Sequence, residues 1–315
     1  MRPDPFPEVV AREGIMSIEL RYSLLALLAA VISAAYWVLT EVTVNYFAVP
    51  SIVAAMWGGM LGGLMLLALA GRRGSLRVDA WGRADWVRMV VGGLLIHGAG
   101  FVLTFMATSL IGAGKANLLG QIQTFFVVIL AVIFLGERFT RRQTAGVALA
   151  LAGVILLNFD RSAMWVTWGT GETLTLLARL MIAVGIVVMK PLFDHGNAAG
   201  STGVAMVVGA LFLFAAYPFS RAGVSGISGG WIPVLLILTL ASGRGIAWLC
   251  FNASQQYIGA SRAAIIFLSV SFFAVFFQLL VAWRAPGLGV QVPHDLGMAL
   301  AGGLLVAAGI VVLQS

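Results

Sequence analysis

The chain has 315 residues, of which 61% are hydrophobic and only 10% are charged. Soluble domains carry about 25% charged residues, so this composition excludes a water-soluble globular protein and predicts an integral membrane protein. The net charge of +7 is not gathered into a basic run interleaved with aromatics, so no nucleic-acid partner is predicted. Cys250 is the single cysteine, which excludes an internal disulfide framework; no metal site and no cofactor are predicted.

Residues 1–19 are expected to form an N-terminal cytoplasmic segment. Residues 1–20 contain prolines and mixed charges without an apolar core, so a cleavable signal peptide is not expected. Met16 leads directly into the first apolar run, and it stands beside Met1 as a candidate for the true start.

Ten apolar segments approach the ~20 residues that a membrane-spanning helix needs. They are too long and too evenly apolar for the alternating strands of a membrane barrel. Helices also satisfy their own backbone groups where no water is present. We therefore predict an all-α integral membrane protein of ten transmembrane helices. The spans cover residues 22–42, 49–71, 86–108, 113–135, 142–159, 172–191, 201–219, 231–253, 260–283 and 295–313.

The loop cations predict the orientation of these spans in a cytoplasmic (inner) membrane. Two of the nineteen Lys and Arg residues fall inside spans, and with the N-terminus inside, thirteen of the others collect on the cytoplasmic side. Cytoplasmic loops carry an excess of Lys and Arg, so both termini are expected in the cytoplasm. The four outer cations are Lys115, Arg161, Arg221 and Arg284.

The sequence repeats itself. Residues 111–116 (IGAGKA) recur as residues 258–263 (IGASRA) at an offset of 147, and residues 145–157 align with residues 301–313. Each half contains five spans, and an odd number inverts the second half relative to the first. We therefore expect two inverted five-helix repeats, residues 20–160 and 161–315. Inverted repeats are typical of secondary transporters whose site lies near the midplane, between the halves.

One motif at the end of the first half identifies a family resemblance. Residues 134–138 (FLGER) are followed by residues 143–149 (QTAGVAL) and 152–154 (AGV), and residues 188–190 (VMK) end the sixth span. In this pattern the chain resembles the EamA-type branch of the drug/metabolite transporter superfamily. The resemblance covers roughly residues 20–315. It implies ten helices, termini inside, and the export or exchange of small metabolites.

The chain departs from that family pattern in three places. Thr124 and its repeat counterpart Ser271 replace a proline in the middle of the fourth and ninth helices. The second repeat has Trp283-Arg284 where the pattern has Gly-Glu, and Trp57 stands where an arginine is common. These departures leave the substrate open.

Polar groups inside the predicted spans are the first candidates for a site. His97 lies about eleven residues from Trp86, hence roughly 16 Å deep at 1.5 Å per residue, and Arg244 is similarly deep, 147 residues further along the chain. Arg179 is a second intramembrane cation, and Glu41 lies near the outer end of the first span.

Each of these groups has a functional and a structural interpretation. Arg244 and Arg179 can hold a carboxylate or phosphate, or they can pair with Glu41 or with backbone carbonyls. His97 can act on the substrate or a proton, or bridge two helices by a hydrogen bond. Glu41 can couple transport to protons or pair with an arginine.

Further candidates lie on the same helix faces. Asn117 and Gln121 are one turn apart on the fourth helix, and Asn252 is near the Arg244 face of the eighth. Phe101 and Trp248 occupy matching positions of the two halves and can wall a cavity. The alternative for all five is ordinary helix packing or lipid contact.

The sequence favours a secondary transporter, an exporter or exchanger working by alternating access. Its substrate is expected to be a small organic metabolite, anionic or zwitterionic, such as an amino acid or organic acid. A lipid or lipid-linked headgroup flippase is one alternative, and a non-transporting receptor or assembly factor is another. No enzyme is predicted, because the spans lack paired carboxylates, a Cys/His set and metal-ligand spacing. The expected partners are the solute and the bilayer, and the protein is expected as a monomer or homodimer.

Overall fold

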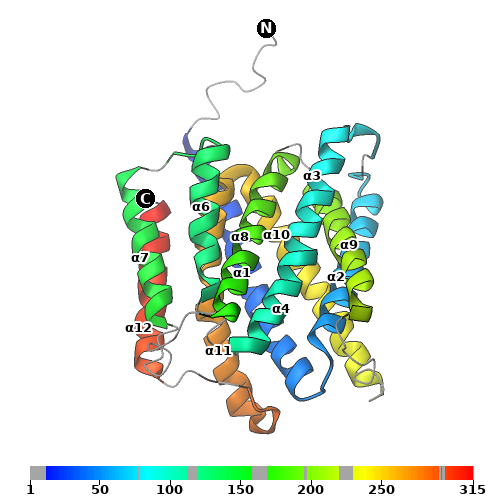
Figure 1. Ribbon diagram of the computed structural model, residues 1–315. Helices are drawn as coiled ribbons and strands as arrows, with labels where there is room; N and C mark the ends of the chain where they lie inside the picture. Colours follow the sequence, from blue (N-terminus) through cyan, green and yellow to red (C-terminus); the bar gives the residue numbers. More distant parts are fainter. Residues whose placement is uncertain are drawn as a thin grey trace.

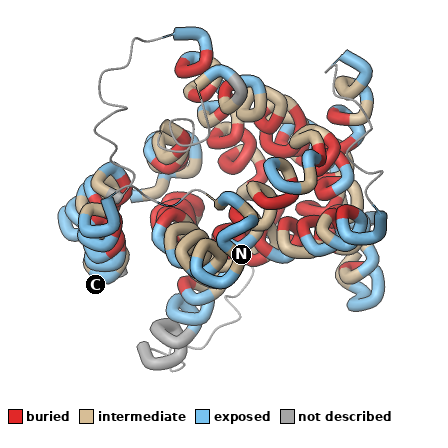
Figure 2. The backbone as a smooth tube through the Cα atoms, turned by 90° about the horizontal axis from the view of Figure 1, so that it is seen from below, coloured by how far each residue is buried: buried red, intermediate tan, exposed pale blue. Residues whose placement is uncertain are grey.

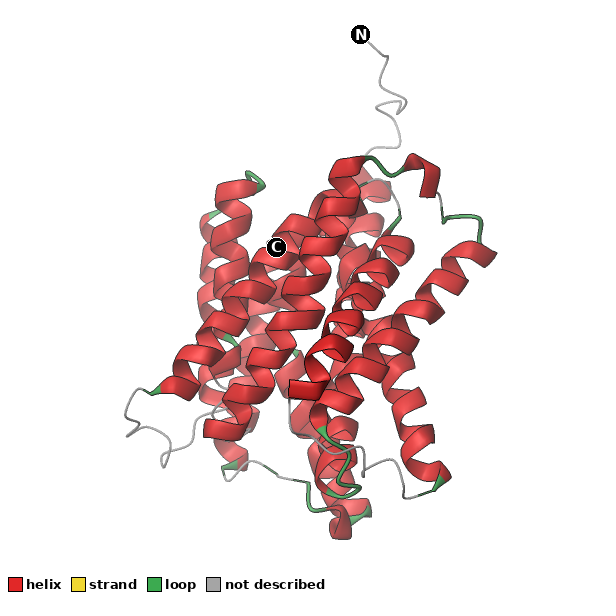
Figure 3. Ribbon diagram, turned by 45° about the vertical axis from the view of Figure 1, so that its right-hand side comes forward, coloured by secondary structure: helices red, strands yellow, loops and turns green. Residues whose placement is uncertain are grey.

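A computed structural model describes residues 12–76, 78–111, 119–138, 140–157, 169–194, 197–219, 230–290, 292 and 295–314 of the chain. These residues form helices joined by short connections, and no strand occurs among them (Figure 3). The long helices are α1 (Arg12–Asn45), α2 (Ser51–Arg72), α3 (Arg83–Gly93), α4 (Gly100–Ile111), α6 (Ile122–Phe134), α7 (Arg141–Leu157), α8 (Thr170–Phe193), α9 (Ala198–Ala216), α10 (Trp231–Phe267), α11 (Val270–Arg284) and α12 (Leu296–Gln314).

The ten predicted spans are confirmed as helices. Seven described helices are long and apolar enough to cross a membrane, and Ile122–Phe134 and Val270–Arg284 are shorter apolar helices. The tenth, α7, has 17 residues. One π-helical turn, η2 (Leu94–Ala99), joins α3 to α4 without a loop, so these three segments form a single span.

The eighth span is longer than predicted. Residues 254–259 were expected to connect it to the ninth span, yet the helix that begins at Trp231 continues to Ile258, and the next helical arm begins at Ala260, where the ninth span was expected. A single residue, Gly259, separates the two arms, with φ 80° and ψ 166°. Glycine has no Cβ and adopts this backbone conformation without strain, so one residue can redirect the chain where the sequence suggested a loop.

The helix pairings follow the two-fold exchange expected of inverted repeats. The pair α1·α10 has its counterpart in α4·α8, and α6·α8 has its counterpart in α1·α11. The pairs α2·α9 and α7·α12 join each helix to its own repeat counterpart. Figure 1 shows α7 and α12 side by side at the left of the molecule. Each half therefore packs mainly through the other half.

Small residues allow these helices to approach closely. A Cβ added at Gly146 of α7 would lie 2.7 Å from the Gly309 carbonyl of α12, and one added at Gly62 of α2 would lie 2.6 Å from the Ala241 carbonyl of α10. Buried residues gather where helices meet and exposed ones cover the outside (Figure 2). Large apolar side chains such as Leu304 and Phe134 are 72% and 70% exposed. An apolar exterior with a small-residue interior is the arrangement that lipid favours.

The first and last described helices begin and end on the same side of the bundle. The beginning of α1 and the end of α12 lie toward the upper side of Figure 1. We refer to this as the N-terminal side. The loop that joins α6 to α7 and the interruption of α10 at Gly259 lie on that side as well, since both line one pocket with Glu19 of α1.

Candidate functional site

Arg244 is the largest fully buried side chain among the described residues, with 2% of its surface exposed. It lies about midway between the start of α10 and Gly259. Its Nη1 donates a hydrogen bond to the Ala55 carbonyl of α2 (2.9 Å), and its Nη2 lies 3.3 Å from Nδ1 of His97. Its Cζ stands 4.1 Å above the centre of the Phe101 ring. A guanidinium this deep is costly in a bilayer unless protein, water or a ligand surrounds it.

The contact with Arg244 determines the protonation of His97. An arginine has donors only, so Nδ1 of His97 must accept, and the imidazole is neutral with its proton on Nε2. This Nε2 is buried and has no hydrogen-bond partner in the described part of the chain. Nδ1 of His97 therefore bridges two helices through its hydrogen bond with Arg244, while Nε2–H is a donor without a partner among the described groups.

The π-helical turn places His97 in this position. The turn η2 inserts an extra residue into the α3–α4 helix around His97, and such turns occur often at functional sites. Gly209 of α9 packs directly against the His97 side chain, where a Cβ would collide with it. A Cβ at Gly59 of α2 would lie 3.6 Å from Nη1 of Arg244, which is an ordinary van der Waals distance. The glycine on α9 therefore makes room for the His97 side chain.

Aromatic side chains enclose the pair. Trp248 meets the His97 ring edge to face, with 4.9 Å between ring centroids, and Trp37 stacks on Phe101 at 6.5 Å. Tyr36 of α1 interacts electrostatically with Arg244. The structure thus brings together four of the predicted site residues, His97, Phe101, Arg244 and Trp248, and adds two from α1 that the sequence analysis did not select.

Arg179 occupies a different place. It extends from α8 toward α6, where its Nη1 lies 3.5 Å from Oε1 of Gln123 and its guanidinium fills the space beside Gly120. Its Nε is buried and has no partner among the described groups. None of the contacts found for Arg179 is with Arg244 or His97. Arg244 and Arg179 therefore form two separate cationic sites, each at a different interface between helices.

The remaining predicted residues are spread over the bundle. Asn252 is buried, donates to Oγ1 of Thr202 on α9 (2.8 Å) and accepts from Gln255 (3.1 Å), so it links two helices. Gln121 is half-buried at the start of α6, and Glu41 is half-buried near the end of α1. Asn117 lies outside the described residues. The described residues contain no group of three or more His, Cys, Asp or Glu side chains placed to hold a metal ion.

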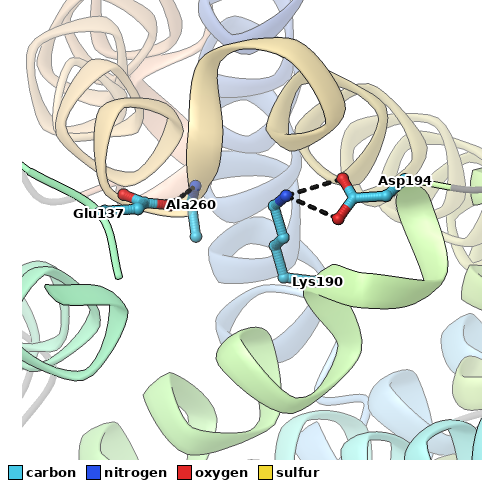
Figure 4. A network of polar contacts seen from close by, with 4 residues as sticks. All are labelled: Glu137, Lys190, Asp194 and Ala260. Carbon is cyan, nitrogen blue, oxygen red and sulfur yellow. Dashed lines mark hydrogen bonds and ion pairs between the residues drawn. The ribbon is translucent and has the colours of Figure 1, made fainter. Parts of the chain in front are cut away.

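Glu137, from the motif at residues 134–138, forms a contact that the sequence analysis missed. Its Oε1 accepts a hydrogen bond from the Ala260 N–H at 2.7 Å (Figure 4). Its Oε2 accepts one from the Ser261 N–H at 3.1 Å. These are the first amides after the interruption of α10. The same view shows Lys190 at the end of α8, paired with Asp194 at 2.7 and 2.8 Å. Gly259 lies in the repeated motif at residues 258–263, and this was the sequence signal available for the break in α10. No sequence signal indicated that Glu137 contacts the break.

The chain is similar to curated transporters of bacteria. It is 36% identical over 106 residues to a "Probable amino-acid metabolite efflux pump" of Escherichia coli (strain K12), a match that covers 33% of this chain and 36% of that protein. It is 28% identical over 303 residues to a "Probable terminal-alkyne amino-acid exporter" of Streptantibioticus cattleyicolor, covering 90% and 94% of the two chains. The first match spans about a third of the relative; the second is nearly complete.

Fold and family comparisons agree with these matches. A solved crystal structure superposes with a TM-score of 0.71 at 20% sequence identity, covering 93% of this chain and 97% of the other, which shows a shared fold. The model of the EamA-like transporter family matches residues 20–159 and 169–289, one match in each half of the chain. The chain therefore belongs to the EamA-like transporter family.

Proposed function

We propose that this transporter moves a small anionic or zwitterionic metabolite, an amino acid or organic acid, out of the cytoplasm by alternating access. The observation that carries this proposal is the Arg244–His97 pair, which is buried, enclosed by aromatic side chains and contributed once by each half. No ion pair between described residues includes Arg244. A carboxylate of the substrate is the charge that this guanidinium would select.

The free donor on His97 supports the same substrate class. Nε of Arg244 and Nε2 of His97 are both buried and have no partner in the described part of the chain, so each is a donor that a substrate carboxylate could satisfy. Phe101 and Trp248 would then pack against the apolar part of the solute. The relatives named for amino-acid efflux and export support export as the direction.

The placement in the membrane is part of the proposal. We propose that the N-terminal side faces the cytoplasm and that the two repeats are residues 20–160 and 161–315. Arg138 and Arg262 line the same pocket on that side. The excess of cations that sequence analysis assigned to the cytoplasm includes both residues.

The test is transport by purified protein in liposomes. Wild-type protein should carry labelled amino acids or organic acids, and Arg244→Ala should reduce the flux at least tenfold, because the carboxylate loses its partner. Arg244→Lys should recover only part of it, since an ammonium lacks the fork of donors. Arg88→Ala is the matched control; this partly exposed arginine pairs only locally with Asp85, and its flux should be unchanged.

A ligand screen separates the substrate classes. Thermal stability of the wild-type protein should rise with anionic or zwitterionic solutes, and Arg244→Ala should lose that rise. Stabilisation by cationic compounds alone, or full flux in Arg244→Ala, would refute the proposal.

A further inference from the structure

The interruption of α10 connects the two halves of the protein through one carboxylate. Glu137 belongs to the loop after α6, in the first half, whereas Ala260 and Ser261 begin the second arm of α10, in the second half. Both carboxylate oxygens are used, one for each amide, at 2.7 and 3.1 Å. The first amides of a helix have no partner within it, and a negative charge at that end is favourable. We call these two hydrogen bonds the Glu137 gate contact.

Other contacts close the bundle at the same place. Tyr257, two residues before Gly259, stacks on Tyr22 of α1 with 4.0 Å between ring centroids. Arg262, three residues after Gly259, lies 3.9 Å from Glu19 of α1. A pocket of about 290 Å³ lies among these groups, lined by Glu19, Glu137, Arg138, Tyr257, Ile258, Gly259 and Arg262. The beginning of α1 and the α6–α7 loop are thus both held against the interruption of α10.

The repeat counterpart of Glu137 has the opposite charge. At the offset of 147 residues that relates the two halves, Glu137 corresponds to Arg284 at the end of α11. The Arg284 guanidinium lies 4.2 Å over the ring of its neighbour Trp283. An arginine has no acceptor, so Arg284 cannot cap the first amides of a helix as Glu137 does. The amides that correspond to Ala260 and Ser261 belong to Ala113 and Gly114, outside the described residues.

We propose that the Glu137 gate contact keeps the transporter closed on its N-terminal side, and that Arg284, the repeat counterpart of Glu137, cannot form the same contact on the opposite side. Opening the N-terminal side separates the α6–α7 loop from α10, which breaks two charge-assisted hydrogen bonds and uncovers two amides. Arg284 has only donors, so it cannot accept such hydrogen bonds when the opposite side closes. The resting protein is therefore closed on the N-terminal side, as in this structure. The inference rests on the alternating access proposed above, but its test needs no substrate.

The experiment measures access to one cysteine from each side of the membrane. Cys250→Ser removes the single native thiol, and Gln255→Cys introduces a probe that is 0% exposed here and lies on the Arg244 face of α10, between Arg244 and Gly259. A membrane-impermeant thiol reagent is applied to right-side-out and inside-out vesicles. Glu137→Gln should raise the labelling rate from the N-terminal side at least fivefold and lower it from the other side. An amide keeps one acceptor but turns its NH2 group toward the second N–H.

A second variant tests the asymmetry without touching Glu137. Arg284→Glu restores a carboxylate at the repeat-related position and should stabilise closure of the opposite side. Its labelling should therefore also rise from the N-terminal side and fall from the other. Asp295→Asn is the matched control. This carboxylate accepts from the Met298 N–H at the start of its own helix (3.0 Å), so both rates should stay at the parent value.

The outcomes are distinguishable. Unchanged rates in folded Glu137→Gln protein would overturn the gate contact, and an equal rise from both sides would show loosened packing instead of gating. The rate changes above would stand even if no amino acid or organic acid were transported, in which case the proposed substrate fails and the gate contact survives.

Discussion

At the scale of single residues, Arg244 and His97 each supply a hydrogen-bond partner for the other's buried side chain. The guanidinium needs acceptors at this depth, and it has two, the Ala55 carbonyl and Nδ1 of His97. Both residues occupy matching positions of the two halves of the sequence. In the structure, Nη2 of Arg244 lies 3.3 Å from Nδ1 of His97. Their part in substrate binding stays a prediction. Tyr36 and Trp37 could not be selected, because aromatics in an apolar helix give no periodic or charge signal that distinguishes a site from lipid contact.

One prediction concerns the acceptor on His97. His97→Leu leaves Nη2 of Arg244 without it and should lower the free energy of unfolding by about 1–3 kcal/mol. His97→Asn keeps an oxygen near the position of Nδ1 and should lose clearly less. Chemical unfolding in mixed micelles measures both. Equal losses would mean that the acceptor contributes nothing and that only the volume of the side chain matters.

At the scale of elements, two interruptions of helical geometry shape the site and the gate contact. The π-helical turn at residues 94–99 rotates His97 toward Arg244, and Gly259 ends the first arm of α10. Hydrophobic periodicity predicted neither. Residues 94–99 are apolar apart from His97, so one extra residue in the turn does not change the pattern, and the polar residues 254–257 suggested a longer connection than the single residue Gly259. The repeated motif at residues 258–263 marked the second position without indicating its conformation.

A substitution at Gly259 tests the second interruption. Gly259→Ala forces an L-residue to φ 80° and places its Cβ 2.8 Å from Oε1 of Glu137. The backbone strain alone should cost about 1–2 kcal/mol of unfolding free energy. The matched control is Gly58→Ala in α2, where an added Cβ meets nothing within 4 Å and φ is ordinary. A lower thermal midpoint is expected for Gly259→Ala only, and a shared decrease would argue against strain.

At the scale of the whole molecule, exchange of the two halves organises the packing. The pairs α1·α10 and α4·α8 interchange under the repeat, and α7·α12 joins counterparts. A symmetric scaffold of this kind can adopt two related states, one open to each side. Arg244 and His97, like Glu137 and Arg284, break that symmetry with groups of different chemistry at matching positions.

The orientation of the scaffold gives a prediction at this scale. Reporter fusions at both termini, and one after Asp194 at the end of α8, should be active in the cytoplasm, whereas one inserted between α11 and α12 should be active outside. The excess of loop cations on the N-terminal side is the physical reason. An inverted pattern for all four fusions would refute the proposed orientation and leave the fold unchanged.

The sequence by itself determined the membrane class, the number of helices, the repeat and the family, because hydrophobic length, charge bias and motif spacing are properties of the chain alone. Tertiary structure decided which polar groups meet. Arg179 and Arg244 looked equivalent as intramembrane cations, yet one lies beside Gln123 and the other on His97. Glu137 looked like a loop residue until the fold placed two amides, 123 and 124 positions away in sequence, against it. Such contacts depend on how helices from opposite halves are juxtaposed, and no local pattern encodes that.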